Sequence, residues 1–146
     1  MKKLLLVLVS CVSISVNAQN NQQIDSSQFK AEIKFEETLH DFGNIQEGTL
    51  AAYEFIFTNT GKAPLVLSNV QPSCGCTSPE WSKEPVAPGA KGKVKAVYNS
   101  YGRPGNFQKY ITVKSNAANT QVDLTIKGTV LSKPVEPVSP VRNPVN

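Results

Sequence analysis

The chain has 146 residues, of which 40% are hydrophobic, so it can form one globular domain and is not intrinsically disordered. Its formal net charge is +4, and two of the positive charges, Lys2 and Lys3, lie at the extreme N-terminus. The other basic residues are dispersed, so we do not expect a nucleic-acid-binding protein. Ten prolines and nine glycines recur at short intervals, which favours short strands joined by turns over long helices.

The first 18 residues have the layout of a signal peptide. Lys2 and Lys3 precede an apolar stretch over residues 4–16, and Val16-Asn17-Ala18 fits the small-x-small pattern of a cleavage site. We therefore predict cleavage after Ala18 and export to the periplasm, the outer envelope or the exterior. No other apolar run is long enough to cross a bilayer, so no transmembrane segment is expected in the mature chain.

The segment Leu8-Val9-Ser10-Cys11 supports an alternative, because it resembles a bacterial lipobox whose cysteine is lipidated. Cys11 would come very early for such a site, and the apolar stretch continues past it to Val16. We therefore favour cleavage after Ala18, with a lipid anchor on Cys11 as the alternative.

Two segments outside the predicted domain lack a core-forming pattern. Residues 19–29 are rich in Asn, Gln and Ser, which predicts a flexible leader. Residues 133–146 carry proline at positions 134, 137, 140 and 144, which favours an extended polyproline conformation. We favour a frayed tail there over a spacer or a ligand for a partner. The folded domain is expected to occupy residues 30–132.

The central part of the chain has the period of β-strands. Apolar and polar side chains alternate cleanly over residues 31–36, 51–58, 93–98 and 122–127, and less cleanly over 64–70 and 107–114. Residues 42–45 suggest a further short piece. Alternation places one face of each strand in the core and the other in water. Turn residues separate these runs at 59–62, 87–89, 103–106 and 116–119. About seven strands in about 100 residues predict an all-β, immunoglobulin-like β-sandwich.

Cys74-Gly75-Cys76 is the most distinctive element of the mature chain. Export favours oxidation, and cysteines two positions apart can just form a disulfide if Gly75 bends the backbone. So small a ring adds little entropic stability and is strained, hence more readily reduced than an ordinary bridge. Three roles remain open: a local staple that shapes the loop, thiol–disulfide exchange, or binding of a soft metal ion such as copper. Zinc is the weaker metal candidate, because only His40 adds a typical third ligand.

Three further residues, His40, Asp41 and Trp81, are candidate auxiliary site residues. His40 is the single histidine and is expected at the surface or rim, with a ligand role as the lesser alternative. Asp41 is expected to form an Asx-type turn, with Phe42 closing the end of the sandwich. Trp81 is expected to pack over the cysteine loop or, if exposed, to anchor a partner. No Ser-His-Asp set, phosphate loop or paired carboxylate site is recognisable, so thiol exchange is the one enzymatic activity considered.

Several short motifs resemble one known family. They are His40-Asp41-Phe42-Gly43-x-Ile45-x-Glu47-Gly48, Phe55-x-Phe57-x-Asn59-Thr60-Gly61, Pro64-Leu65, Val70-x-Pro72-Ser73-Cys74-Gly75-Cys76-Thr77 and Pro88-Gly89. Their order resembles the bacterial DUF1573 family over residues 33–130, and the Ser-Cys-Gly-Cys-Thr element is the most specific piece. The resemblance implies an immunoglobulin-like β-sandwich that is commonly exported or lipid-anchored. It implies no activity.

Two functions follow as expectations. The first is a non-enzymatic interaction or structural module of the cell envelope, without a cofactor, that binds a protein or glycan partner through loops or a strand edge. The alternative is a thiol redox or copper-binding protein that uses Cys74 and Cys76.

Overall fold

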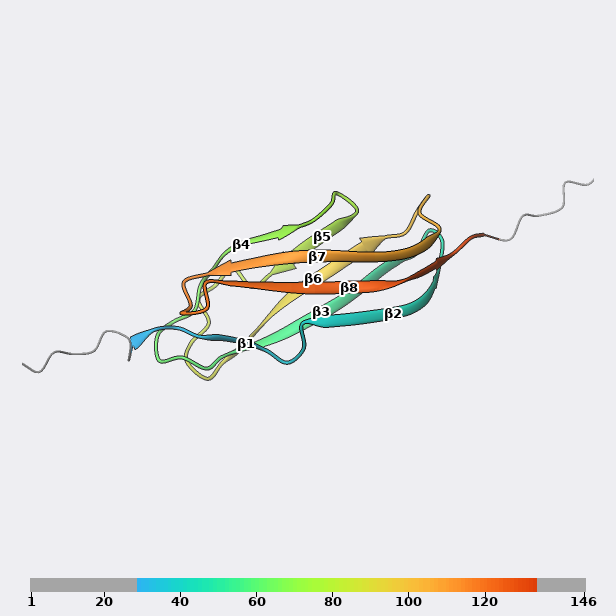
Figure 1. Cartoon of the computed structure of the whole chain (residues 1–146). Coiled ribbons are helices and arrows are strands. Elements are labelled where there is room, and N and C mark those ends of the chain that lie inside the picture. The colour runs from blue at the N-terminus through green and yellow to red at the C-terminus, as the bar shows by residue number, and fades with distance from the viewer. Residues whose placement is uncertain (1–28, 134–146) are drawn as a thin grey trace, which may run out of the picture.

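The computed structural model describes residues 29–133, which form two packed four-stranded sheets (Figure 1). The strands are β1 (Ile33–Phe35), β2 (Leu39–Gln46), β3 (Leu50–Asn59), β4 (Leu67–Pro72), β5 (Thr77–Trp81), β6 (Lys91–Asn99), β7 (Gly105–Ser115) and β8 (Gln121–Leu131). The prediction of an all-β, immunoglobulin-like sandwich is confirmed. The predicted signal peptide, Cys11, most of the leader and the proline-rich segment from residue 134 onward lie outside the described residues. No helix within residues 29–133 has the length and apolar character needed to cross a bilayer.

Two strands depart from the sequence-based expectation. β2 extends over eight residues, whereas the sequence suggested only the piece at residues 42–45. A register shift between Asp41 and Asn44 interrupts the apolar–polar alternation of this strand, so the pattern did not predict its full length. β5 was not expected at all, because it contains Pro79, which is tolerated in a strand chiefly at the edge of a sheet.

Consecutive strands alternate between the two sheets from β1 to β5, whereas β5–β6 and β7–β8 each pair within one sheet. One sheet has the order β1-β3-β6-β5 and the other has the order β2-β8-β7-β4. The parallel pair β2–β8 is the exception among antiparallel pairs in the described sheets. β1 and β2 therefore close one side of the sandwich, and β4 and β5 close the other. The loop between β4 and β5 crosses from one sheet to the other.

The core lies between the sheets and follows directly from the alternation in the central strands. The inward side chains of β3, β6, β7 and β8 are almost fully buried: Phe55, Phe57, Val94, Ala96, Tyr98, Ile111, Val113, Leu124 and Ile126. Burial of each large apolar side chain contributes roughly 1.5–3 kcal/mol. Tyr98 of one sheet stacks on Phe107 of the other with ring centroids 4.0 Å apart, so the layers interlock.

The two ends of the sandwich carry different loops. At one end, here called the cysteine end, the Asn99 N–H donates to the Cys76 carbonyl at 2.9 Å, and the Ser100 N–H donates to the Thr49 carbonyl at 3.1 Å. These bonds join the β2–β3, β4–β5 and β6–β7 loops. The described segment enters at the opposite end and leaves from the cysteine end after Lys133 (Figure 1).

The motif Asn59-Thr60-Gly61 has a structural role at the end of β3. The Asn59 side chain is fully buried, and its Nδ2 donates to the carbonyls of Ala63 at 2.8 Å and Val86 at 2.9 Å. Its Oδ1 accepts from the Gly61 N–H at 3.0 Å. A Cβ at Gly61 would collide with the backbone of Lys30. This part of the motif therefore organises loops and needs no ligand to explain it.

Candidate functional site

Cys74 and Cys76 form a disulfide in the loop that crosses between the sheets. Their Cα atoms lie 5.3 Å apart, within the usual range for a bridge. Cys76 is buried and 8% exposed, whereas Cys74 is half-buried at the edge of the core. The Thr77 hydroxyl oxygen lies 3.9 Å from Cys74 Sγ and 4.0 Å from Cys76 Sγ. The two sulfurs thus differ in exposure and share one polar neighbour.

Gly75 lies in the turn between the two cysteines, with a backbone conformation that other residues can also adopt. Its φ is not positive, and a Cβ built on it would meet nothing within 4 Å. The backbone bends between the cysteines as expected, but the bend does not require glycine, because an L-residue fits there without strain. The small loop is held instead by backbone hydrogen bonds on both sides, from the Ser73 N–H to the Tyr110 carbonyl at 2.8 Å and from the Asn99 N–H to the Cys76 carbonyl at 2.9 Å.

Trp81 packs against the core and lies at the far end of β5 from the cysteine loop. The register pairs Thr77 with Tyr98 and Trp81 with Val94, so four strand residues separate the indole from the loop. The expected packing over the loop is therefore not found. Lys83 Nζ lies 3.0 Å from the centroid of the indole, which covers the ring with a cation. The Nε1–H of Trp81 has no hydrogen-bond partner within the described part of the chain.

His40 does not join the cysteines. It points inward from β2, half-buried, and stacks on Tyr53 of the other sheet with ring centroids 3.5 Å apart and planes inclined by 9°. β2 and β4 are the two edges of one sheet, so three strand spacings, roughly 14 Å, separate His40 from the strand that leads to Cys74. Within residues 29–133, no group of three or more His, Cys, Asp or Glu side chains converges. Copper would therefore have to bind the reduced thiolates, with any further ligand from elsewhere.

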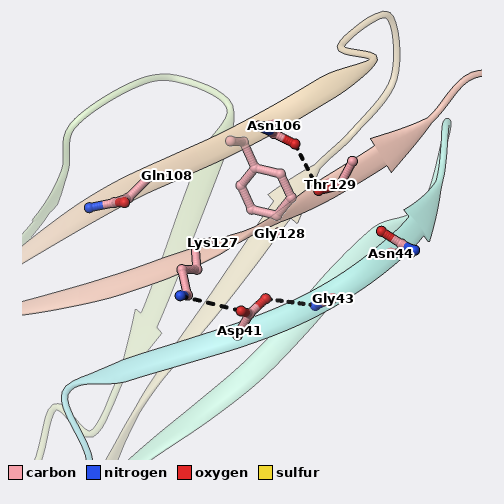
Figure 2. Close-up of a pocket in the computed structure, with 9 residues that line it drawn as sticks. Asp41, Gly43, Asn44, Asn106, Gln108, Lys127, Gly128 and Thr129 are labelled. Carbon is pink, nitrogen blue, oxygen red and sulfur yellow. Dashed lines mark hydrogen bonds and ion pairs between the residues drawn. The ribbon is translucent and has the colours of Figure 1, made fainter.

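Asp41 forms the predicted Asx-type turn. Its Oδ1 accepts from the Gly43 N–H at 2.8 Å, and its Oδ2 lies 3.4 Å from Lys127 Nζ (Figure 2). Gly43 has a positive φ of 61°, which glycine adopts without strain. The hydrogen bond from the Gly43 N–H is the largest cause of a lowered pKa of Asp41; desolvation opposes it, and Lys127 lowers the pKa further. Opposite the turn, a Cβ on Gly128 would stand 2.8 Å from the Gly43 carbonyl oxygen, so the strands approach closely here.

The two outer faces of the sandwich differ in chemistry. On the β1-β3-β6-β5 face, three ion pairs join Lys91 to Glu36, Lys93 to Glu54 and Lys95 to Glu80. The outward residues of β2, β8, β7 and β4, here called the amide face, are mostly uncharged: Asn44, Asn69, Gln71, Asn106, Gln108, Tyr110, Thr112, Gln121, Thr125 and Thr129. Its charged members are Asp41, Asp123, Lys114 and Lys127, which balance in sign.

The amide face has one exposed aromatic side chain and two shallow hollows. Tyr110 projects from the middle of β7 and is 48% exposed, and its hydroxyl accepts from Gln108 Nε2 at 2.6 Å. The larger hollow, of about 530 Å³, lies beside the Asp41 turn between β2, β8 and β7 (Figure 2). The second, of about 350 Å³, is lined by Tyr110 itself together with Gln71, Ser73 and Thr112. Along β7, the tyrosine therefore stands between the two hollows.

The edges of both sheets carry features that oppose the addition of another strand. β1 has only three residues, and β5 contains Pro79, which removes a backbone donor. β2 has a register shift between Asp41 and Asn44, and β4 has one between Leu67 and Asn69. Bulges twist an edge away from a new partner strand. The faces and loops are thus better suited to recognition than the edges.

Sequence reasoning missed the amide face. The signal was present in the polar positions 106, 108, 110, 112 and 114, which alternate with apolar or partly buried ones in β7. It could not be read as a site, because the residues that complete the face come from β2, β4 and β8. Ser73 and Tyr110, for example, are 37 positions apart and are joined by a hydrogen bond of 3.1 Å from the Tyr110 N–H to Ser73 Oγ.

The fold and its loops define an immunoglobulin-like β-sandwich domain with a cysteine pair in the sheet-crossing loop. Residues 33–130 match the family described as "Protein of unknown function (DUF1573)", and the chain belongs to this family. A search of curated proteins gives no match.

Solved structures of low sequence identity share the fold. A protein of unknown function from Porphyromonas gingivalis W83 superposes with a TM-score of 0.62 at 14% identity, over 75% of this chain and 51% of the other. A PapD-like domain of human CEP192 gives 0.57 at 10% identity, over 91% and 99%. The VesB protease of Vibrio cholerae gives 0.53 at 14% identity, over 69% and 31%. The chain thus spans about half of the Porphyromonas protein, and these likenesses concern the fold alone.

Proposed function

We propose that the chain is an exported, non-enzymatic interaction module of the cell envelope and that it binds its partner through the amide face. The observation that carries this proposal is the contrast between the two outer faces. The charged side chains of one face are paired with each other at 2.6, 2.7 and 3.5 Å. The other face presents amides, hydroxyls and a half-exposed tyrosine. Such groups can exchange water for a ligand at little electrostatic cost.

A pair of matched threonines tests the choice of face. Thr125 lies on the amide face opposite Tyr110, and Thr58 lies on the ion-paired face opposite Lys91. A photoreactive amino acid placed at position 125 of the full chain in living cells should cross-link to an envelope component. The same amino acid at position 58 should not. Equal cross-linking from both positions, or none from position 125, would contradict the proposal.

Export has its own test. The proposal expects the chain in the envelope or medium, with a mass that begins at Gln19 after cleavage. A diacylglyceryl mass on Cys11 would keep the module in the envelope but replace cleavage at Ala18 by lipid anchoring. A chain that retains Met1 and stays in the cytoplasm would overturn the envelope assignment.

Thiol–disulfide exchange is the second candidate function, and the unequal exposure of the two sulfurs favours it. A partner thiolate would attack the half-buried Cys74 Sγ, break its bond to Cys76 Sγ and leave the electron pair on Cys76 as a thiolate. Donation from the Thr77 hydroxyl, 4.0 Å away, would stabilise that thiolate. A second partner thiolate would then attack the partner sulfur of the mixed disulfide at Cys74. Cys74 leaves as a thiolate, and the two partner sulfurs depart as a disulfide.

Redox titration distinguishes exchange from a structural staple. Because the bridge closes a loop of only three residues, loop entropy contributes roughly 1.6 kcal/mol to it, against about 3 kcal/mol for a 15-residue loop. If the pair exchanges thiols, the bridge should be reduced at a potential above about −300 mV. The potential should be lower in Thr77→Val, because valine cannot donate a hydrogen bond that stabilises the reduced Cys76 thiolate. A bridge that stays oxidised below about −300 mV would leave Cys74 and Cys76 with the staple role alone.

A further inference from the structure

We propose that the amide face binds a neutral oligosaccharide, with one sugar ring stacked on Tyr110. This inference rests on the proposed function, because it names the class of partner for the same face. It is carried by three features of the described residues: the placement of the tyrosine, the donor and acceptor chemistry around it, and the properties of this surface that disfavour other classes of ligand.

Tyr110 has the position that stacking requires. It is 48% exposed on an otherwise flat sheet, with a hollow on either side along β7. The hydrogen bond of 2.6 Å from Gln108 Nε2 to its hydroxyl holds the ring in one orientation, so little conformational entropy is lost on binding. An aromatic ring is apolar on its faces and can cover the C–H groups of a sugar, while its hydroxyl remains wet.

The surrounding side chains offer both donors and acceptors without net charge. Asn106 Oδ1 accepts from the Thr129 hydroxyl at 2.8 Å, which leaves the NH₂ group of this amide as a donor. The side chains of Asn44, Gln71 and Thr125 make no hydrogen bond within residues 29–133. Sugar hydroxyls donate and accept in turn, so carboxamides and hydroxyls match them better than charged groups do.

The four charges on the face, on Asp41, Asp123, Lys114 and Lys127, sum to zero. Lys127 pairs with Asp41 at 3.4 Å, and the Asp123 carboxylate accepts from the Thr112 hydroxyl at 2.7 Å. The face therefore lacks the excess of positive charge that a nucleic acid or an acidic glycan requires. It also lacks the clustered apolar side chains of a protein–protein hot spot, because Leu39 and Leu131, the large aliphatic side chains exposed on it, lie at separate places: Leu39 is opposite Thr125, six residues before Leu131 on β8.

The dimensions of the face suit a chain of sugars. Outward side chains on one strand repeat at roughly 6.8 Å, so the row from Gln108 through Tyr110 to Thr112 extends over roughly 14 Å. Both hollows adjoin this row. A peptide ligand would instead be expected to extend a sheet, and all four edges oppose that, through the short β1, the bulges of β2 and β4, and Pro79 in β5.

The test uses the full chain and two uncharged probes, the hexamers of N-acetylglucosamine and of glucose. Binding of at least one at millimolar or lower concentration should shift the backbone amide resonances of β7 and its neighbours. Tyr110→Ala should weaken that binding about tenfold, which corresponds to about 1.4 kcal/mol and to the upper part of the range for an aromatic contact. Tyr101→Ala is the matched control, because Tyr101 is 68% exposed in the β6–β7 loop and outside the face.

The outcomes separate the two proposals. Binding that Tyr110→Ala abolishes and Tyr101→Ala retains supports the glycan. No binding of either hexamer, or binding that is unaffected by Tyr110→Ala, overturns it. Tighter binding of an anionic sugar hexamer than of the neutral ones overturns the neutral class. If cross-linking from position 125 succeeds while these assays show no binding, the proposal of an interaction module is kept and that of a glycan ligand is rejected. If both fail, the proposed function falls as well.

Discussion

His40 of β2 stacks face to face on Tyr53 of β3, with ring centroids 3.5 Å apart, and this contact joins the two sheets along one side of the sandwich. Phe42 meets the same histidine edge-on at 4.7 Å, and Tyr53 meets the buried Phe55 edge-on at 4.9 Å. The single histidine of the chain is thus part of an aromatic cluster. Its surroundings explain it as a packing residue.

Replacement of His40 should therefore reduce stability and leave ligand binding at the amide face intact. Aromatic pairs contribute about 0.5–1.5 kcal/mol beyond the area they bury, so His40→Ala should lower the free energy of unfolding by about 1–2 kcal/mol. His40→Phe should recover most of the loss, because the ring stacks without its nitrogens. Urea unfolding measures both variants. A His40→Phe protein as unstable as His40→Ala would show that the imidazole nitrogens matter.

Asn59 should be among the most sensitive polar positions of the domain. Asn59→Ala removes the donor to the Ala63 carbonyl, one of the two donors to the Val86 carbonyl and the acceptor of the Gly61 N–H, and we expect a loss of about 2–4 kcal/mol. Asn59→Asp should be no better, since a carboxylate cannot donate to a carbonyl. Asn116 is the control: it donates to the Pro64 carbonyl at 3.0 Å from an exposed site, so Asn116→Ala should cost about 1 kcal/mol or less. Equal losses at both asparagines would refute the burial argument.

Two glycines in the described strands and loops should respond oppositely to alanine. A Cβ at Gly92 would clash with the ring of the fully buried Phe57, so Gly92→Ala should destabilise the fold by about 1–3 kcal/mol. Gly75 has open space and an ordinary φ, so Gly75→Ala should leave stability unchanged or raise it by about 0.4–1 kcal/mol. Thermal unfolding with the disulfide intact compares them. Destabilisation by Gly75→Ala would mean that the cysteine loop needs glycine after all.

Asp41 should titrate below the ordinary aspartate pKa. Because the pKa is lowered in the folded state, the stabilising contribution is present above the unfolded-state pKa and is lost as the pH falls through the lower folded-state pKa. The Gly43 N–H is the largest cause, so the pKa of Asp41 should stay below the ordinary value in Lys127→Ala. NMR titration of the Asp41 carboxyl carbon measures both proteins. A return to the ordinary pKa in Lys127→Ala would assign the effect to the ion pair instead.

The regular strands could be predicted because the alternation of core and solvent positions is a property of each strand's own sequence. Strands β3, β6 and β8 alternate between core and water over most of their length, so the sequence predicts both the strand and its buried side. β2 and β5 escaped prediction because a bulge and a proline break the period of two. Such features depend on the place of the strand at a sheet edge, and that place is decided by the whole topology.

The site was less accessible to sequence reasoning for the same reason. The pairing of Cys74 with Cys76 and the Asx turn at Asp41 involve residues two positions apart, and both were anticipated. The setting of Tyr110 depends on pairing between strands, since Thr125 lies opposite it and Ser73 beside it. Trp81 was misplaced because its sequence distance from Cys76 says nothing about the direction in which the strand leaves the loop.

The chain enters and leaves the sandwich at opposite ends, and β2 runs parallel to β8. A pull on the two ends of the domain would draw β2 one way and β8 the other, which loads the hydrogen bonds between them in shear, all at once. Strands that peel apart break such bonds one by one and yield at lower force. A domain pulled at its two ends would therefore resist extension along its own long axis.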